Sequence, residues 1–408
     1  MANGSVERPY GWVIVGIATM CLTLGFGANV TVSILIGPLE SEFNWLRADI
    51  SFAYTMLSIG AAVGGLYWGA LSDKIGARRI GFLGSVVISI ALVGISLQTK
   101  LWAIYALYFL IGSVGFACLF TPMLALTGLW FDGRKGLALG IVTAGGAIGQ
   151  GIIPALFRMM ITEWGWREAT FYLGIGYFVI LVPLMFLLRP PPLLSQPGNN
   201  VKQSDDTLWG LPHKTSITWL AVAGIFCCIC MAVPIIHLVP LGTDLGLSPE
   251  TATSLLFALM ISGTFGRIFF GLLADRIGGL YSYAIASLGQ TVVVFWFTQT
   301  SDLFSLYVLA VLFGFGFSGV MTCLIICSRE AAPLRITGFA VAVVTATAWV
   351  GMGVGGYQGG FFYDLTGSYT VSYANAAAAG VINLTILALL VWFRKSRTRQ
   401  LSTASLNP

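Results

Sequence analysis

The chain has 408 residues, of which 57% are hydrophobic and only 9% are charged, and its formal net charge is +5. A soluble globular domain carries about 25% charged residues, so this composition cannot supply a water-exposed surface. It excludes soluble enzymes and soluble binding modules and indicates a membrane protein.

Apolar stretches of about 20 residues recur along the chain, and a helix of that length crosses roughly 30 Å of hydrocarbon. An outer-membrane barrel would instead show alternating segments of about 10 residues. We therefore expect an all-α polytopic membrane protein with twelve transmembrane helices in two six-helix bundles. The spans are expected near 11–34, 50–72, 79–98, 101–128, 136–158 and 167–188, and then near 215–240, 251–274, 280–298, 302–328, 335–359 and 370–393.

A polar segment, RPPPLLSQPGNNVKQSDDTLWGLPHK, separates the two sets of spans. Its Pro, Asn, Gln and Asp content is typical of a flexible linker. The expected organisation is an N-terminal bundle at 1–188, a cytoplasmic linker at 189–214, a C-terminal bundle at 215–393 and a cytoplasmic tail at 394–408.

The distribution of Lys and Arg predicts the orientation, because cytoplasmic loops carry the excess of positive charge. With both termini in the cytoplasm, 16 of these residues lie on the cytoplasmic side, and four, Arg47, Lys100, Arg158 and Arg167, lie on the other. The net charge of +5 then reflects topology, and we expect no binding to nucleic acid.

No expected span carries a carboxylate pair, a Ser/His/Asp set or closely spaced histidines, so we expect no enzymatic activity. All seven cysteines fall inside expected spans, and the CCIC sequence at 227–230 has no clustered His or carboxylate. We interpret these cysteines as core residues rather than metal ligands, and we expect no cofactor.

Arg267 is the one charged residue expected inside a span, because the remaining Lys, Arg, Asp and Glu residues fall in loops or tails. An unpaired guanidinium at bilayer depth is destabilising by several kcal/mol, so it usually faces a water-filled cavity and meets a ligand. Arg267 therefore predicts a carrier of negatively charged compounds. The alternative is a structural arginine that pairs with carbonyls at a helix end.

A short charged motif occurs once in each set of spans. The sequence GALSDKIGARR runs from Gly69 to Arg79, and GLLADRIGG runs from Gly271 to Gly279, with their aspartates 202 residues apart. Twelve spans with this doubled motif resemble the major facilitator superfamily. The resemblance implies two bundles that rock about a substrate site near the bilayer midplane. It assigns a cytoplasmic gating role to Asp73, Arg78, Arg79, Asp275 and Arg276.

Four further stretches are similar to the monocarboxylate transporter family and its oxalate/formate antiporter relatives. They read RPYGWVIV, WFDGRKGLALGIVTAGGAIGQ, VPIIHLVPLGTDLGLSP and GGYQGGFFYDLTGSY. This resemblance implies that Arg267 binds the substrate carboxylate. It suggests a conformational role for Arg134 and Lys135, which could otherwise serve topology alone. The short loops between the spans favour a protein of a prokaryotic inner membrane.

The chain departs from the family pattern in its membrane charges. Well-studied animal members have an aspartate one turn before the arginine, where this chain has Gly263, and a lysine late in the first span, where it has GANVTVSI. The antiporters carry a second cation in the eleventh span, and this chain has none there. One cation suits one carboxylate, because a dianion would leave a charge unpaired in a low-dielectric cavity.

Other candidates are polar or aromatic residues on spans expected to line the cavity. Each is alternatively a hydrogen bond between helices. His237, near the outer face and about 20 Å in depth from Arg267, is a candidate proton-responsive gate or an interfacial histidine bonded to a loop. The candidate substrate contacts are Asn29, Thr121, Thr143, Trp349, Gln358, Tyr373 and Asn375.

The favoured function is a secondary active transporter that moves small monocarboxylates, such as lactate, pyruvate or formate, by alternating access and with proton linkage. The alternatives are an anion exchanger or a carrier of another organic anion, such as oxalate, and a non-transporting membrane sensor. The expected partners are the carboxylate, protons and the lipid bilayer, and the expected functional unit is a monomer.

Overall fold

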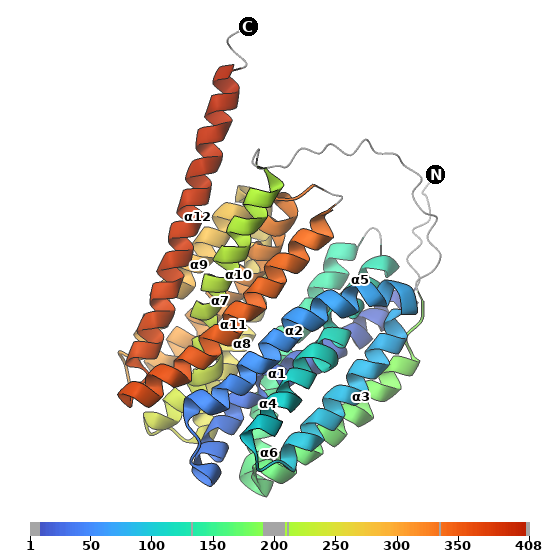
Figure 1. Ribbon diagram of the computed structural model, residues 1–408, viewed down its shortest axis with the longest axis vertical. Coiled ribbons are helices and arrows are strands. Elements are labelled where there is room, and N and C mark those ends of the chain that lie inside the picture. The colour runs from blue at the N-terminus through green and yellow to red at the C-terminus, as the bar shows by residue number, and fades with distance from the viewer. Residues whose placement is uncertain (1–8, 132–133, 191–208, 210–211, 334–335, 405–408) are drawn as a thin grey trace.

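The computed structural model describes residues 9–131, 134–190, 209, 212–333 and 336–404, and these form helices joined by short turns (Figure 1). The first half of the chain forms α1 (Tyr10–Phe43), α2 (Arg47–Ile75), α3 (Ala77–Ser96), α4 (Leu101–Leu110), the π-helix η1 (Ile111–Phe116), α5 (Ala117–Trp130) and α6 (Lys135–Phe186). The second half forms α7 (His213–Asp244), α8 (Pro249–Ile277), α9 (Gly279–Trp296), α10 (Leu303–Glu330), α11 (Thr337–Thr366) and α12 (Thr370–Ala404).

These helices account for the twelve expected spans. Ten helical segments of the described chain are long and apolar enough to cross a membrane. One of them joins α4, η1 and α5 into a single span, and another, within α6, holds two spans. The 18-residue helix α9 completes the set. The fold is therefore the predicted all-α arrangement of two six-helix bundles, which we call the N-half and the C-half.

The boundary between the fifth and sixth spans differs from the expected loop. Helical backbone continues through α6 except at Gly165, whose φ of 80° and ψ of 162° break the helix. Only glycine adopts this conformation readily, because a Cβ atom would clash with the backbone. A single glycine thus replaces the loop predicted between 158 and 167.

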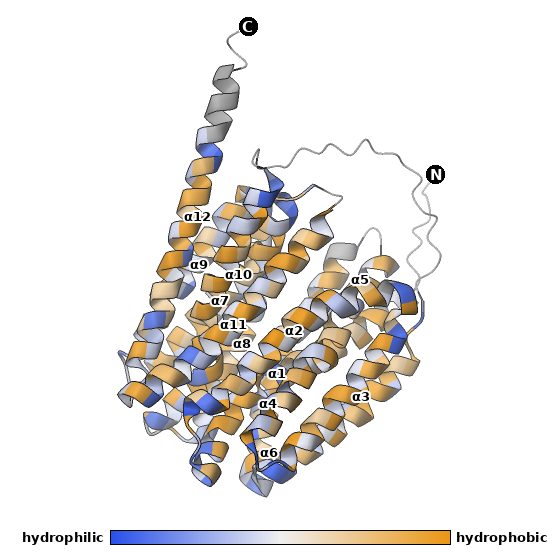
Figure 2. Ribbon diagram, in the orientation of Figure 1, coloured by the Kyte–Doolittle hydropathy of each residue, from blue (hydrophilic) through white to orange (hydrophobic). Residues whose placement is uncertain are grey.

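Hydrophobic residues cover the sides of the molecule. Figure 2 shows hydrophilic residues gathered towards the two ends of the helices, with apolar residues between them. Large side chains such as Ile90, Val179 and Leu272 are between 60% and 62% exposed. An apolar surface of this kind suits contact with lipid, because the bilayer interior solvates apolar groups.

The sequence repeat reappears as a repeat of helix packing. On α2, a Cβ atom added to Gly64 would overlap the carbonyl oxygen of Ser113, and on α8 one added to Gly266 would overlap that of Phe315. Gly64 lies 202 residues before Gly266, and Ser113 lies 202 residues before Phe315. The aspartates of the two charged motifs have the same separation. Small residues at these points allow the backbones of neighbouring helices to approach closely.

The two halves meet along two antiparallel helix pairs, α2 with α11 and α6 with α8. Along α2 and α11, Thr55 Oγ1 donates a hydrogen bond to the carbonyl of Gly353 at 2.8 Å. Along α6 and α8, Gly151 packs against Phe257 and Met260. We call the end where α1 begins and α12 ends the terminal end, and the opposite end the distal end (Figure 1).

The repeated glycine contacts predict a stability effect. We expect Gly64→Ala and Gly266→Ala each to destabilise the protein by about 1–3 kcal/mol, because the added methyl group overlaps a backbone carbonyl that cannot move independently. Thermal unfolding of the purified protein in detergent would measure this as a lower Tm. Gly289→Ala on α9, where the added carbon meets no atom within 4 Å, is the matched control. Equal Tm values for all variants would contradict this account of the packing.

Candidate functional site

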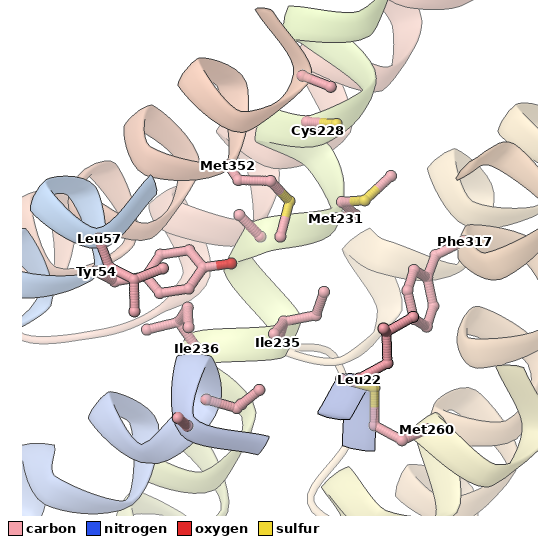
Figure 3. Close-up of a cluster of buried hydrophobic side chains, with 14 of the residues drawn as sticks. Leu22, Tyr54, Leu57, Cys228, Met231, Ile235, Ile236, Met260, Phe317 and Met352 are labelled. Atoms are coloured by element: carbon pink, nitrogen blue, oxygen red, sulfur yellow. The ribbon is translucent and has the colours of Figure 1, made fainter. Parts of the chain in front are cut away.

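At mid-depth the space between the halves is filled by apolar side chains from both of them. Figure 3 shows Leu22 of α1 close to Met260 of α8 and Phe317 of α10, with Tyr54 and Met352 in the same cluster. All five are buried. The halves therefore meet through apolar contact in the middle of the molecule. The polar residues predicted to bind substrate lie at several separate contacts.

Arg267 lies on the face of α8 that meets α6. Its Nη1 donates a hydrogen bond of 2.6 Å to the backbone carbonyl of Thr143, so this contact crosses from the C-half to the N-half. The hydroxyl of Thr143 is bonded to carbonyls of its own helix, at Leu139 and Gly140. Thr143 thus contributes its backbone oxygen, and its side chain does not reach Arg267.

The charge of Arg267 has no counterion among the described residues. A carbonyl oxygen offers a dipole, whereas the guanidinium carries a full charge and five N–H donors. Its Nε is buried and has no hydrogen-bond partner within the described part of the chain. A half-buried cation with a donor shielded from water and no counterion is stabilised when an anion joins it. The structure therefore places a guanidinium with unused N–H donors on the seam between the halves, near the terminal end.

Asn29 lies at a different depth from Arg267. Helices α1 and α6 run side by side with Thr19 opposite Gly145 and Thr23 opposite Gly149, which places Thr143 level with Ile17. Asn29 is twelve residues further along α1, or about 18 Å nearer the distal end. Its amide is buried without a partner among the described residues. The structure therefore does not bring Asn29 and Arg267 together around one small ligand.

Trp349 and Thr121 occupy separate contacts. Trp349 of α11 packs against Phe26 and Phe116 of the N-half, with ring centroids 6.4 and 5.3 Å apart. It therefore belongs to the aromatic contact between the halves. Thr121 of α5 faces Gly69 on α2, inside the N-half.

Gln358, Tyr373 and Asn375 link helices within the C-half. The side-chain oxygen of Gln358 accepts a 2.8 Å hydrogen bond from Asn375, and its nitrogen donates to the carbonyl of Ser372 at 3.4 Å. Tyr373 is fully buried beside Phe297. These contacts join α11, α12 and the end of α9, and they do not reach Arg267.

A buried arginine at the distal end, Arg47, joins the two halves, whereas the sequence predicted only its side of the membrane. Arg47 is 8% exposed, and its Nη1 and Nη2 donate to the Asp244 carboxylate of α7 at 2.6 and 2.8 Å. Its Nε donates to Glu40 of α1 at 2.9 Å, and Nη1 also donates to the hydroxyl of Tyr369 at 3.2 Å. The guanidinium lies 4.0 Å from the centre of the Tyr363 ring. Each of its nitrogens has a partner.

Asp364 of α11 adds a second link at the same place. Its carboxylate accepts hydrogen bonds from the backbone N–H groups of Arg47 and Ala48, at 3.2 and 2.7 Å. These donors begin α2 and lack partners within their helix, and a carboxylate there also interacts favourably with the helix dipole. We call this set the distal latch; it comprises Glu40, Arg47, Asp244, Asp364 and Tyr369.

One sequence signal could have identified the latch. Arg47 begins α2, and a cation at a helix N-terminus is disfavoured by the helix dipole unless acidic groups surround it. The identity of its main partner is not readable in this way, because Asp244 lies 197 residues away in the other half of the chain.

His237 belongs to the surroundings of the latch. Its Nε2 lies 2.7 Å from the carbonyl oxygen of Gly356 and therefore donates to it, which makes Nδ1 of the neutral ring an acceptor. The hydroxyl of Tyr369, 3.2 Å away, can donate to that nitrogen. Burial raises the pKa of the Tyr369 phenol above its ordinary value, so the hydroxyl keeps this proton. His237 thus supports the latch partner Tyr369.

A cavity of about 480 Å³ opens beside the latch between α1, α6, α7 and α8. Its wall includes Ser33, Glu40, Arg47, Arg158 and Thr243. Arg158 forms another ion pair between the halves, with 3.2 Å between its Nε and the carboxylate of Glu250. This cavity is at the distal end and does not contain Arg267.

The charged motifs lie at the terminal end. The turns after α2 and α8 are made by Gly76 and Gly278, each with φ of 89°. The side chains of Asp73 and Lys135 lie outside the described residues. The remaining gating candidates are all exposed at this end: Arg78, Arg79, Arg134, Asp275 and Arg276.

Comparison with known proteins agrees with this arrangement. The model of the Major Facilitator Superfamily matches residues 15–333 and 218–406. The chain is 29% identical to monocarboxylate transporter 13 of Rattus norvegicus over 396 residues, which cover 90% of this chain and 86% of that protein. It is 25% identical to the uncharacterized MFS-type transporter YcxA of Bacillus subtilis over 349 residues, covering 83% and 84% of the two chains.

A solved structure shows the same fold. The crystal structure of a bacterial homologue of the human lysosomal transporter Spinster superposes with a TM-score of 0.73, at 15% identity, over 96% of this chain and 98% of that one. The match to the family model confirms the superfamily resemblance that the charged motifs suggested. The chain belongs to the major facilitator superfamily and is an integral membrane transporter with monocarboxylate transporters among its relatives.

Proposed function

We propose that this transporter moves small monocarboxylates across the membrane by alternating access, with Arg267 as the group that binds the carboxylate. The observation that carries the proposal is the state of this guanidinium: half-buried at the seam between the halves with a buried Nε, bonded to one backbone carbonyl and without a counterion among the described residues. Two parallel N–H donors of an arginine match the two oxygens of a carboxylate.

The charge balance favours a monoanion. One carboxylate neutralises Arg267, whereas the second charge of a dianion such as oxalate would remain unpaired in a medium of low dielectric constant. Within the described spans we find no second cation near Arg267 to receive it. A monocarboxylate is therefore the proposed substrate class.

The position of Arg267 connects binding to movement of the halves. In this conformation Arg267 bonds across the seam to Thr143, and an arriving carboxylate competes for the same donors. Exchange of the carbonyl for the carboxylate removes a link between α8 and α6. Substrate binding would thereby shift the balance between conformations in which the terminal end is closed and open, as differential affinity requires.

The distal latch is the proposed gate of the opposite mouth. It joins α1 and α2 to α7 and α11 with charged hydrogen bonds around the buried guanidinium and backbone of Arg47. Substrate could enter from the distal side only after Arg47 and Asp244 separate. His237 would act on this gate through Tyr369, and the exposed charged motifs would act at the terminal end.

Proton linkage is proposed from the relationship to monocarboxylate transporters. The described residues place no carboxylate beside Arg267, so the proton would travel with the substrate or bind at His237 and the acids of the distal latch. Either route moves no net charge with a monocarboxylate.

Removal of the guanidinium tests the binding role. We expect Arg267→Ala to reduce counterflow of labelled lactate in proteoliposomes by at least about 100-fold, because loss of a buried charged partner typically amounts to several kcal/mol. Lys100→Ala, which removes an exposed cation away from the seam, is the control. Full uptake by Arg267→Ala would refute the proposal.

Charge exchange tests the distal gate. Arg47→Asp should open the distal end and increase labelling of a cysteine introduced by Ser33→Cys in the adjacent cavity, several-fold over the parent protein. The native cysteines are buried and give a low background. Adding Asp244→Arg should restore slow labelling, because the pair is re-formed with reversed charges. Unchanged labelling in Arg47→Asp would show that the latch does not hold this end closed.

A pH gradient tests the coupling. If protons accompany the substrate, an alkaline interior should accelerate lactate uptake into proteoliposomes, and a protonophore should abolish the acceleration. The control holds pH equal on both sides and loads unlabelled lactate inside. Uptake that requires internal anion and ignores the pH gradient would instead indicate an anion exchanger.

A further inference from the structure

We propose that Thr264 is a specificity-determining residue whose hydroxyl binds the oxygen on the second carbon of a 2-hydroxy or 2-oxo monocarboxylate while Arg267 holds the carboxylate. This inference rests on the proposed function, since it requires a carboxylate at Arg267. It adds a second point of contact that distinguishes acids of equal charge and similar size.

The hydroxyl of Thr264 has no hydrogen-bond partner among the described residues, and its oxygen, Oγ1, is buried. A threonine inside a helix ordinarily donates to a carbonyl three or four residues earlier. Thr253, on the same helix, donates to Pro249 at 2.7 Å, and Thr322 on α10 donates to Ser318 at 3.1 Å. Thr264 therefore holds its hydroxyl away from its own backbone, at the expense of a hydrogen bond.

The helix geometry places this hydroxyl beside the anion site. Thr264 lies four residues after Met260 and three before Arg267, and both of these side chains meet α6. Residues at this spacing share one face of a helix, with Cβ atoms about 5–6 Å apart. Side chains also lean towards the N-terminus of their helix, so Arg267 leans over the turn that carries Thr264.

The two unpartnered groups complement each other chemically. Among the described residues, Nε of Arg267 has no acceptor, and Oγ1 of Thr264, which can both donate and accept, has no partner. A 2-hydroxy or 2-oxo acid carries its extra oxygen on the carbon next to the carboxylate. With the carboxylate on Arg267, that oxygen accepts from Thr264 when it is a carbonyl and donates to it when it is a hydroxyl.

The neighbouring position cannot take this role. A Cβ atom at Gly263 would overlap Oγ of Ser318, so this side of α8 is packed against α10. Ser318 also has a buried hydroxyl without a partner among the described residues, but it lies on that packed side. Thr264 is the hydroxyl on the side of the helix that faces α6.

The test compares two acids that differ by one hydroxyl. Uptake of labelled L-lactate and of propionate is measured in proteoliposomes containing the full chain, as the wild type, Thr264→Val, Thr264→Ser and Thr253→Val. Valine keeps the shape of threonine and removes the hydroxyl, and serine keeps the hydroxyl. Thr253→Val makes the same change on the same helix at a hydroxyl that is already bonded to the backbone.

We expect the wild type to favour L-lactate over propionate, and Thr264→Val to raise KM for L-lactate by roughly 3- to 10-fold, the effect of one neutral hydrogen bond. KM for propionate should stay within about 2-fold. Thr264→Ser should keep the preference, and Thr253→Val should leave both KM values unchanged.

Equal effects of Thr264→Val on the two acids, or none on either, would overturn the assignment of Thr264. That outcome leaves the proposed function standing as long as Arg267→Ala abolishes uptake of both acids. Uptake of both acids by Arg267→Ala would instead remove the anion site itself.

Discussion

The structure of this transporter depends on the hydrogen-bond and charge partners of two arginines between its halves. Arg47 and Arg267 both lie at contacts between the two halves, and they have opposite electrostatic situations. Arg47 is bonded through every guanidinium nitrogen to groups from both halves, two of them carboxylates. Arg267 has a carbonyl and no counterion among the described residues. A cation whose partners are all present holds a structure together, whereas one without its anion is poised to bind a ligand.

Close packing inside the C-half determines which side chains α8 can carry one turn before Arg267. The family resemblance made Gly263 conspicuous, because animal relatives have an aspartate there. In this protein a side chain at 263 would overlap Ser318, so the absence of the acid is part of the α8–α10 contact. The same contact is repeated in the N-half between α2 and the α4–η1 segment. Close approach of α8 and α10 thus excludes an acidic side chain at position 263, and the acids that contact Arg47 lie at the distal latch.

Much of the fold was readable in the sequence. Span-length apolar stretches predicted the helices to within a few residues at most ends, and the doubled motif predicted two related halves. The break at Gly165 was not predicted, because apolar content does not reveal whether a turn takes eight residues or one. The helix α1 also extends nine residues beyond its predicted end, since amphipathic sequence can continue a helix past the hydrocarbon.

The features of the site that the sequence predicts differ in physical origin from those that only the tertiary structure decides. The sequence by itself determined that the protein lies in a membrane and that it has two related halves. It also determined that Arg267 is a charge inside a membrane span, where an unpaired charge is destabilising. Each of these conclusions follows from hydrophobicity and spacing along one chain. Only the tertiary structure decided the partners. It separated Asn29 from Arg267 by depth, bonded Gln358 to Asn375 between two helices, and joined Arg47 to Asp244. It also left the hydroxyl of Thr264 without a partner in the part of the chain that the structure describes. Those outcomes depend on helix rotation and register between distant segments, which a one-dimensional pattern does not contain.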